Sequence, residues 1–539
     1  MSRTRRLMLL ALFGTAVVSP VGCTLFCFPV MPPPADSFVG PTPPGAEPKP
    51  PARPPEAPPK PPVPAEPLEL GVGAAILMAV GNNPSLQVER YNPPITRTYE
   101  DEQRAAFDPT LSASLTRNRS RTERRSPYGG GTTSSVAEDT SADVELAQTL
   151  PTGTAVALSG STDLSSSSLY SDRFATSRGG LTITQALLRG FGCAVNLASL
   201  RQARLDTLTS QYELRGFAQD LVASVEETYW DYALAHRQIE IYAASLKLAE
   251  QQLAETDERI RLGQLAETER AAAQAEVALR REALINARSR LATTRLILLR
   301  LVNPAGAWSR EVTLKDAPAV PEAALDGVEA HVEVALRMRP EINEARLRVL
   351  RGDLELVRTR NGLLPQLDLF VTLGKSGYAE SFSSSVRQVH EGRAYDWQAG
   401  LSLEVPLGNR APRARHERAT LTRRQSLEAI GNLVQLVQFD VRSAYIEVGR
   451  AKEQVVATAA TRAFKEEALR AETAKFGVGR STSFLVAQAQ RDLVESQIGE
   501  VEAVVSLLKG IVELYRLEGS LLERRGIDAP GRQPVAEAQ

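Results

Sequence analysis

The chain contains an internal duplication, and this feature constrains its fold more than any other. With a shift of 256 positions, the segment around Asn83 matches the segment around Arg339, and Pro109 matches Pro365. With a shift of 216 positions, a longer stretch aligns without gaps. Its identities include Val225/Val441, Tyr229/Tyr445, Gly263/Gly479 and Leu298/Leu514. The matching blocks follow the same order in both halves, which predicts two copies of one structural unit.

Each half begins with a predicted helical segment, at about 68–107 and at about 324–363. Apolar and polar residues then alternate, most clearly along 366–373 and 400–406. A period of two is typical of a strand with two different faces. Such short strands cannot fold alone, so the pattern favours a sheet with one apolar and one polar side.

Very long helices follow the strands in both halves. Between about 196 and 261 there is no proline, and apolar residues recur at spacings of three and four. This is a coiled-coil-like pattern. Gly263 interrupts the helix, and a second helix ends near Val302. The second half repeats the arrangement, with a helix at about 415–476 and a glycine break at 477–479. A glycine between two periodic helices predicts a reversal of the chain.

Two features break the symmetry of the halves. Pro93 and Pro94 stand where the second half has an unbroken run, and they should kink or split the first helix. The shift falls from 256 at Pro109/Pro365 to 220 at Gly180/Gly400, so the first half is longer between these points by 36 residues. This insert, about 121–177, contains the candidate strands Val144–Leu150 and Thr154–Ser161. It forms either an extra hairpin or a long outward-facing loop.

The N-terminus predicts export and a tether. Three arginines precede an apolar run from Leu7 to Val18, which is too short to span a bilayer but suits a signal peptide. Gly22 directly before Cys23 makes Cys23 a candidate lipid-attachment residue, with ordinary cleavage nearby as the alternative. The segment from Pro29 to Pro67 holds 18 of the 34 prolines, which favours an extended spacer.

These patterns predict a domain order. We expect a signal at 1–23, a Pro-rich linker at 24–67, a first repeat at 68–320, a second repeat at 321–524 and a disordered tail at 525–539. Within the repeats we expect strand regions at about 109–188 and 366–407, and helical hairpins at about 196–303 and 411–519.

Composition argues against several function classes. The 63 basic and 64 acidic residues leave a net charge of −1, whereas a nucleic-acid binder would show a basic excess. Three cysteines and four scattered histidines offer no metal-ligand spacing. Acidic pairs such as Glu226/Glu227 are interpreted as charged helix faces, which are solvated or form pairs between helices, and His236 as a packed side chain on the apolar stripe. We therefore predict no enzyme, no cofactor and no metal site.

Several stretches together resemble the TolC-like outer membrane efflux protein family, over roughly residues 69–524. They are AVGNNPSL at 79–86, FDPTLSASL at 107–115, LTITQALLRGFG at 181–192, RLGQLAETERAAAQAEVA at 261–278 and FGVGRSTSFLVAQAQRDL at 476–493. Any one motif is weak, but their ordered duplication is specific.

The resemblance implies a fold class and partners. The chain would be mainly α with a β-barrel part, built from tandem helix–strand–strand–helix hairpin units. Its long helices would form a trimeric α-barrel continuous with a β-barrel in outer-membrane lipid. The homotrimer would project its helices into the periplasm of a Gram-negative-type bacterium. It would there meet a periplasmic adaptor (membrane fusion) protein and an inner-membrane pump, and serve as a passive conduit for efflux or type I secretion.

The resemblance also implies site residues. The glycine breaks form the periplasmic tip that receives the adaptor, here Leu262, Gly263, Gln264, Val478, Gly479 and Arg480. Several relatives close the tunnel with aspartates six and nine positions after the second glycine. This chain has Leu485 and Gln488 there, while Glu269 occupies the matching first-half position. We expect a closed tip with weaker cation block than in acidic-ring relatives. The alternative is that Glu269 is an ordinary solvated carboxylate.

The competing function is structural. A periplasmic coiled-coil adaptor or scaffold without a membrane barrel would also contain long periodic helices. Such adaptors place one helical hairpin between small β domains, whereas this chain has two hairpins in tandem. The flanking strand pairs therefore favour the channel.

Overall fold

The computed structural model describes residues 67–125, 129–167, 173–304, 308, 310–321 and 325–536. The predicted signal, Cys23 and nearly all of the Pro-rich linker lie outside these ranges. The chain divides into two units, residues 1–63 and 64–539, and every described residue belongs to the second unit.

The first repeat runs from a short strand through helices and four strands to a helical hairpin. Its elements are β1 (Leu68–Leu70), α1 (Val72–Asn82), α2 (Pro84–Glu89), α3 (Asn92–Ala105), β2 (Thr110–Arg125), β3 (Thr132–Thr149), β4 (Thr154–Ser167), β5 (Phe174–Ala186), α4 (Cys193–Asn196), α5 (Ala198–Arg261) and α6 (Thr268–Val302). Residues 68–70 form a strand rather than the predicted start of a helix, because they pair in parallel with β6 (Val312–Leu314).

The second repeat has the same order with two strands instead of four. Its elements are α7 (Val328–Met338), α8 (Pro340–Asn361), β7 (Gln366–Ala379), α9 (Phe382–Glu391), β8 (Tyr395–Glu404), α10 (Arg410–Gly477), α11 (Ser483–Glu518) and α12 (Leu521–Arg524). The predicted duplication of a helix–strand–helical hairpin unit is confirmed in the described part of the chain.

One antiparallel sheet joins the strands of both repeats, in the order β2-β3-β4-β5-β7-β8. The predicted strands at 366–373 and 400–406 are neighbours, with Gln366 opposite Glu404. The insert is the extra hairpin, because β3 and β4 pair around the turn at Gly153, whose φ is +86°. Both strands are longer than predicted. A side chain at Gly153 would also collide with the Gly190 carbonyl oxygen at 2.2 Å, so glycine is required there.

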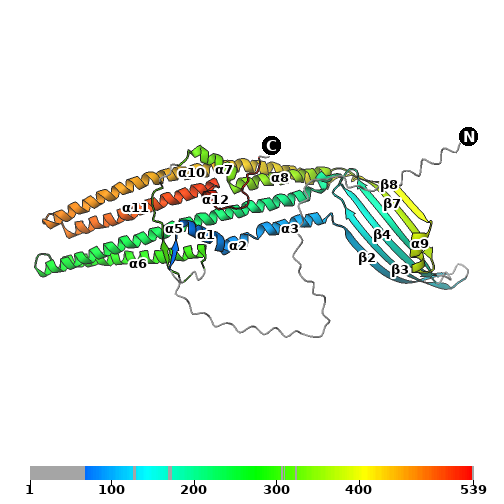
Figure 1. The fold of residues 1–539 in the computed structure, drawn as a ribbon, viewed down its shortest axis with the longest axis horizontal. Helices are drawn as coiled ribbons and strands as arrows, with labels where there is room; N and C mark the ends of the chain where they lie inside the picture. Colours follow the sequence, from blue (N-terminus) through cyan, green and yellow to red (C-terminus); the bar gives the residue numbers. More distant parts are fainter. Residues whose placement is uncertain are drawn as a thin grey trace, which may run out of the picture. The chain divides into compact units, whose positions relative to one another are not determined.

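The four long helices extend away from the sheet as two hairpins (Figure 1). The helices α5 and α10 have 64 and 68 residues, which corresponds to about 100 Å each at about 1.5 Å per residue. Their turns at Gly263 and Gly479 lie at the end opposite the sheet. The predicted polarity of the repeats, with strands at one end and glycine reversals at the other, is confirmed.

The proline pair splits the first helical segment as predicted. The helix α2 ends at Glu89, and α3 begins at Asn92 with proline in its first turn. Proline fits there because the first N–H groups of a helix have no partner within that helix. The second repeat has no such break, so α8 continues to Asn361.

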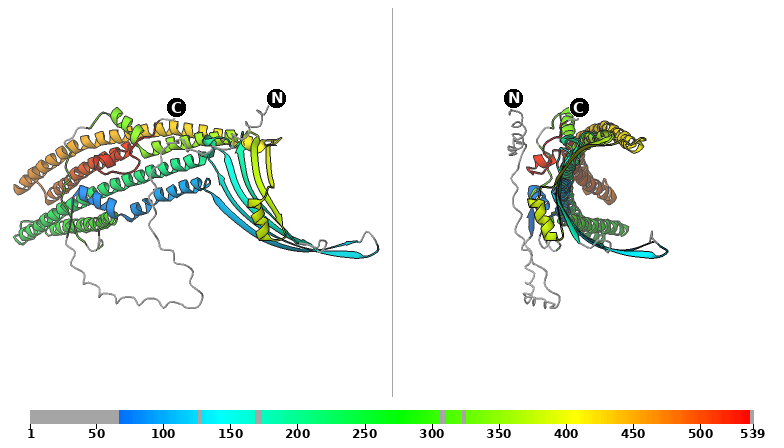
Figure 2. Two further views of the ribbon diagram at one scale, coloured as in Figure 1. Left: turned by 45° about the vertical axis from the view of Figure 1, so that its right-hand side comes forward. Right: turned by 90° about the vertical axis from the view of Figure 1, so that its right-hand side faces the viewer.

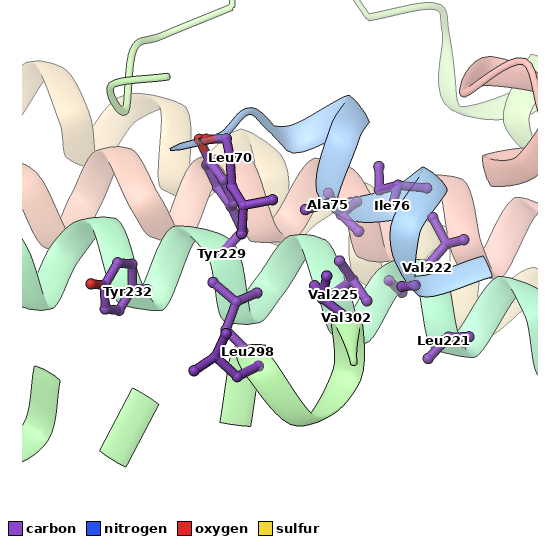
Figure 3. Close-up of a cluster of buried hydrophobic side chains, with 14 of the residues drawn as sticks. Leu70, Ala75, Ile76, Leu221, Val222, Val225, Tyr229, Tyr232, Leu298 and Val302 are labelled. Carbon is purple, nitrogen blue, oxygen red and sulfur yellow. The ribbon is translucent and has the colours of Figure 1, made fainter. Parts of the chain in front are cut away.

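Two hydrophobic clusters lie near the middle of α5 and α10, where α6 and α11 end, and they repeat the duplication in packing. In the first, Val225 and Leu298 are fully buried, together with Tyr229 and Leu70 (Figure 3). The Tyr229 hydroxyl donates to the Leu70 carbonyl at 3.1 Å, so this strand is fixed to α5. The second cluster buries the repeat-equivalent residues Val441 and Leu514. Buried apolar area of this kind stabilises the fold most.

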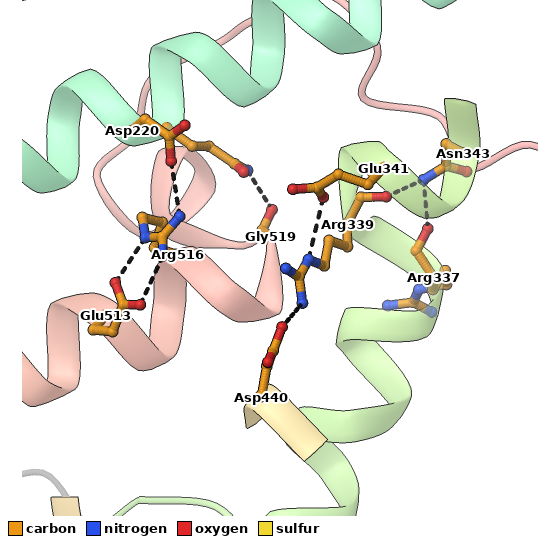
Figure 4. A network of polar contacts seen from close by, with 10 residues as sticks. Asp220, Arg337, Arg339, Glu341, Asn343, Asp440, Glu513, Arg516 and Gly519 are labelled. Carbon is orange, nitrogen blue, oxygen red and sulfur yellow. Dashed lines mark hydrogen bonds and ion pairs between the residues drawn. The ribbon is translucent and has the colours of Figure 1, made fainter. Parts of the chain in front are cut away.

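Ion pairs link neighbouring helices beside these clusters, and the pair of Arg516 with Asp220 joins the two repeats (Figure 4). The Arg516 guanidinium donates to both Glu513 oxygens at 2.7 Å and to Asp220 of α5 at 2.9 Å. Arg339 bridges to Asp440 of α10 at 3.1 Å. Because guanidinium donors have fixed geometry, these contacts set the spacing between α5, α8, α10 and α11.

The C-terminal segment differs from the predicted disordered tail. Residues 525–536 pack along α5 and α8, where Tyr212 donates to the Gln533 carbonyl and the Val535 N–H donates to Asn343 at 2.8 Å. Arg525 forms two hydrogen bonds of 2.6 Å with Glu226. Burial raises the pKa of Glu226, although Arg525 opposes the shift. Ile527 and Ala529 also pack against the first hydrophobic cluster. The sequence pattern missed this segment because these polar and apolar contacts follow no periodicity.

Two interpretations of helix α5 are wrong. Glu226 is fully buried rather than solvated, because Arg525 of the C-terminal segment compensates its charge. His236 is exposed over 59% of its side chain and lies 3.5 Å from Glu240. His236 therefore lies beside the buried stripe of α5 and not on it. The buried residues nearest to it in the sequence are Ala235 and Gln238.

We predict that Arg525→Met destabilises the protein by about 3 kcal/mol, because it leaves the Glu226 carboxylate buried without a partner. The midpoint of thermal unfolding of the purified protein measures this loss. The double variant Glu226→Leu/Arg525→Met is the control and should recover most of it. A single variant that unfolds like the wild type would contradict the account of this pair.

We also predict a pH-dependent cost at Glu344 on α8, where burial and the nearby Glu213 raise the pKa of Glu344 from 4.5 to about 7. The folded protein therefore binds this proton more tightly than the unfolded chain does. The resulting stability is present below pH 4.5 and is lost as the pH rises toward 7. At about 1.4 kcal/mol per pKa unit the cost above pH 7 is at most about 3.5 kcal/mol.

Glu344→Gln should therefore raise the midpoint of thermal unfolding at about pH 8 and change it little at about pH 4. Equal shifts at both values would show that the substitution acts through packing alone.

Candidate functional site: a two-faced sheet and a paired helical tip

The sheet has one apolar face, and this face carries α9, because a side chain on Gly179 of β5 would lie 3.6 Å from Val389 of α9. The helix α9 lies on the convex side of the sheet (Figure 2). Cross-strand pairs share a face, so the register places the alternating apolar residues of all six strands together. The large members are each exposed by 39% or more: Leu111, Leu115, Val144, Leu146, Leu158, Ile183, Leu369, Leu373, Trp397, Leu401 and Leu403. A continuous exposed apolar face of this extent needs an apolar environment.

The opposite, concave face is polar. Arg178 forms an ion pair of 2.5 Å with Asp396 across the sheet, and the Thr182 and Thr372 hydroxyls lie 3.2 Å apart. The Ser114 hydroxyl donates to Asp143 at 3.1 Å. One side of the sheet therefore suits water while the other suits lipid, as in outer-membrane barrels.

The two edge strands of this sheet are β2 and β8. Neither has a second strand partner among the described residues of the chain. An unpaired edge presents a row of free N–H and C=O groups, which is costly in an apolar medium.

No helix in the described ranges has the length and apolar character needed to cross a bilayer. Across the same residues, no group of three or more His, Cys, Asp or Glu side chains is placed to hold a metal ion.

The two tips share one backbone geometry. Gly263 and Gly479 both have φ of +72°, the left-handed conformation that favours glycine. In each turn the next N–H, that of Gln264 or Arg480, donates to a carbonyl five residues earlier, at 2.8 and 2.9 Å. These are Schellman caps, which satisfy the last carbonyls of α5 and α10.

The predicted tip residues are open to solvent within the chain. Leu262 and Val478 are exposed by 60% and 72%. A side chain built on Gly263 or Gly479 would meet no other atom within 4 Å. The structure therefore brings Leu262, Gly263 and Gln264, and separately Val478, Gly479 and Arg480, to the ends of the two hairpins.

Contacts between the hairpins lie just behind the tips. The Arg259 guanidinium stacks over the Phe476 ring at 5.2 Å, and Arg491 pairs with Glu276 at 2.6 Å. Glu269 accepts a hydrogen bond from the Ser483 hydroxyl. The sequence did not indicate these contacts, because each joins residues of different repeats on helix faces that look equally charged.

The candidate constriction residues lie in two places. Glu269 is half-buried in the first turn of α6, where it faces α11, so it is not a fully solvated carboxylate. Leu485 and Gln488 are exposed on α11, and Leu485 is accessible over 44% of its surface.

A two-faced sheet continued by long helical hairpins defines a class of protein, the outer-membrane channels. The family model described as "Outer membrane efflux protein" matches residues 137–303 and 332–520, which together exceed half of the chain. The chain belongs to the outer membrane efflux protein family. This membership confirms the predicted family and the predicted location in the outer membrane.

Solved structures show the same fold. The chain is similar to the outer-membrane channel OprN, with a TM-score of 0.63 and 17% identity over 83% of this chain and 90% of that one. The Campylobacter jejuni CmeC outer membrane channel is similar with a TM-score of 0.60 and 13% identity, over 84% of this chain and 86% of that one. The Neisseria gonorrhoeae MtrE outer membrane channel in its open state is similar with a TM-score of 0.59 and 18% identity, over 84% of this chain and 89% of that one. Comparison with curated protein sequences finds no significant match.

We predict that Leu401→Lys and Ser402→Lys, adjacent in β8 but on opposite faces, have opposite consequences. Leu401→Lys places a charge on the apolar face and should cost about 2–4 kcal/mol of stability in the membrane. Ser402→Lys adds the same charge to the polar face and should be tolerated. The yield of heat-resistant protein in isolated outer membranes measures both. Equal loss in the two variants would contradict the assignment of the faces.

Proposed function

We propose that the protein is the outer-membrane conduit of a tripartite efflux or type I secretion system. Three copies form one channel, which a periplasmic adaptor links to an inner-membrane pump. The observation that carries this proposal is the combination of two unpaired edges, β2 and β8, with a lipid-suited face and a water-suited face on one sheet.

Closure between copies satisfies the edges. If β2 of one copy pairs with β8 of the next, three sheets of six strands make a closed cylinder of eighteen. The polar faces then line a lumen, and the helical hairpins continue its wall. The number three comes from the resemblance to the family. A soluble periplasmic scaffold, the competing function, would leave the apolar face of the sheet exposed to water.

The tips are the proposed adaptor-docking site. Leu262 and Val478 offer exposed apolar contacts beside glycine turns that allow another helix to approach the backbone closely. Outside the described residues, Cys23 is proposed as a lipid attachment that would add a second anchor in the membrane.

We predict that Leu262→Asp/Val478→Asp abolishes docking while the channel still assembles. Two charges per chain at an apolar contact should lower adaptor affinity at least about tenfold. Cross-linking to the adaptor and export in cells measure the loss. Val320→Asp is the control, because it charges an exposed valine of the loop after β6. Normal docking by the double variant would exclude the tips as the contact.

We predict that the purified protein forms ion-conducting pores in planar bilayers and that divalent cations block them weakly. Leu485→Asp should create strong block, because three copies would gather three carboxylates near one axis. The Gln488→Asn variant, which adds no charge, is the control. Absence of any conductance would contradict the conduit, whereas strong block of the wild type would contradict only the assigned constriction.

A further inference from the structure

The helix α9 lies on the convex face of the sheet, at the end far from the helical hairpins (Figure 2). Its Ser385 hydroxyl lies 2.7 Å from that of Ser177, and both side chains are buried. The Gln388 amide oxygen accepts the Tyr378 N–H at 3.1 Å. A side chain at Gly377 would come within 2.1 Å of the Ser385 carbonyl oxygen, so this close packing requires glycine.

A groove runs between α9 and the strands β4 and β5. Gly160, Thr162 and Gly179 form its floor, Val386 and Val389 form its wall, and Lys375 lies at its border. Ser177 and Gly179 share the convex face with Leu181 and Ile183, because side chains alternate along β5. The groove therefore opens on the same side as the apolar face that meets lipid.

The groove lies at the level where this apolar face ends. Along β7 the convex residues are apolar as far as Leu373, and the next one is Lys375. Their partners on β8 are Trp397 and Tyr395, exposed by 69% and 76%. Aromatic side chains followed by a lysine are typical of the boundary between acyl chains and headgroups.

Lys375 places a positive charge at the border of the groove. The Lys375 ammonium donates one hydrogen bond, to the His390 carbonyl at 3.1 Å, which leaves two N–H donors for another partner. Among the described residues, no acidic side chain forms an ion pair with Lys375 or with the exposed Arg387 of α9. Phe382 and Val386 of the same helix are exposed apolar side chains.

We propose that this groove binds a phosphate-bearing glycolipid of the outer leaflet. Lys375 holds a headgroup phosphate, and an acyl chain lies against Val386, Val389 and the glycine floor. The occupant is a lipid because the groove continues the lipid-facing surface, and it is anionic because the border of the groove is cationic. The proposal goes beyond the conduit and depends only on the location of the sheet in the outer membrane.

The test uses the full-length protein in detergent and counts bound lipids by native mass spectrometry. The probes are lipid A, which carries phosphates on a glycolipid, and zwitterionic phosphatidylcholine. We expect the wild type to bind lipid A at least about tenfold more tightly than phosphatidylcholine. Lys375→Gln should remove this preference, and Lys375→Arg should keep it. Gly160→Val should weaken binding of both lipids, because its side chain enters open space in the groove without a clash.

Arg424→Gln is the control, since it removes the same charge from an exposed position on α10. Equal binding of lipid A by the wild type and Lys375→Gln would overturn the proposal, and so would equal affinity of the wild type for the two lipids. Neither result bears on conductance in planar bilayers. The lipid-binding proposal can therefore be wrong while the proposed channel function is right, and the reverse also holds.

Discussion

The edges of the sheet are the constraint on which the rest of the structure depends. A strand in lipid cannot leave its backbone N–H and C=O groups unpaired, because no water is available to satisfy them. Within one chain, β2 and β8 are such edges, and the face between them is apolar on its convex side. A single chain is therefore an incomplete object in the membrane. In the proposed channel, pairing with further copies removes the edges and separates a lipid-facing wall from a polar interior.

The internal duplication makes the two halves of the chain structurally similar. Equivalent residues such as Val225 and Val441 are buried at equivalent places, and Gly263 and Gly479 have the same φ. The repeats are nevertheless unequal, since the first contributes four strands and the second contributes two. The extra hairpin of β3 and β4 enlarges the sheet without adding a helix to the wall. The second repeat instead carries α9 outside the sheet, where the proposed lipid groove lies.

Much of this fold could be predicted from the sequence, because periodicity and duplication are local or repeated signals. Strand alternation, the long helices and both glycine turns follow from such patterns. The contacts of the C-terminal segment could not, because Arg525 meets Glu226 across 299 positions with no repeated signal. For the candidate site, the sequence placed the tip residues at the helix reversals. It could not indicate that Glu269 faces Ser483, since both lie on mixed helix faces.

The most direct test of the account is disulfide cross-linking between β2 and β8 of different copies. Ser114→Cys on β2 is combined in turn with Gln398→Cys or Ser402→Cys on β8, with Cys27 and Cys193 replaced by serine. Within one chain these strands are about 24 Å apart, at about 4.8 Å per strand, so an internal disulfide cannot form. The account predicts that oxidation in outer membranes links three chains covalently at one of these registers and stops there. Chains that remain single, or that form longer ladders, would contradict it.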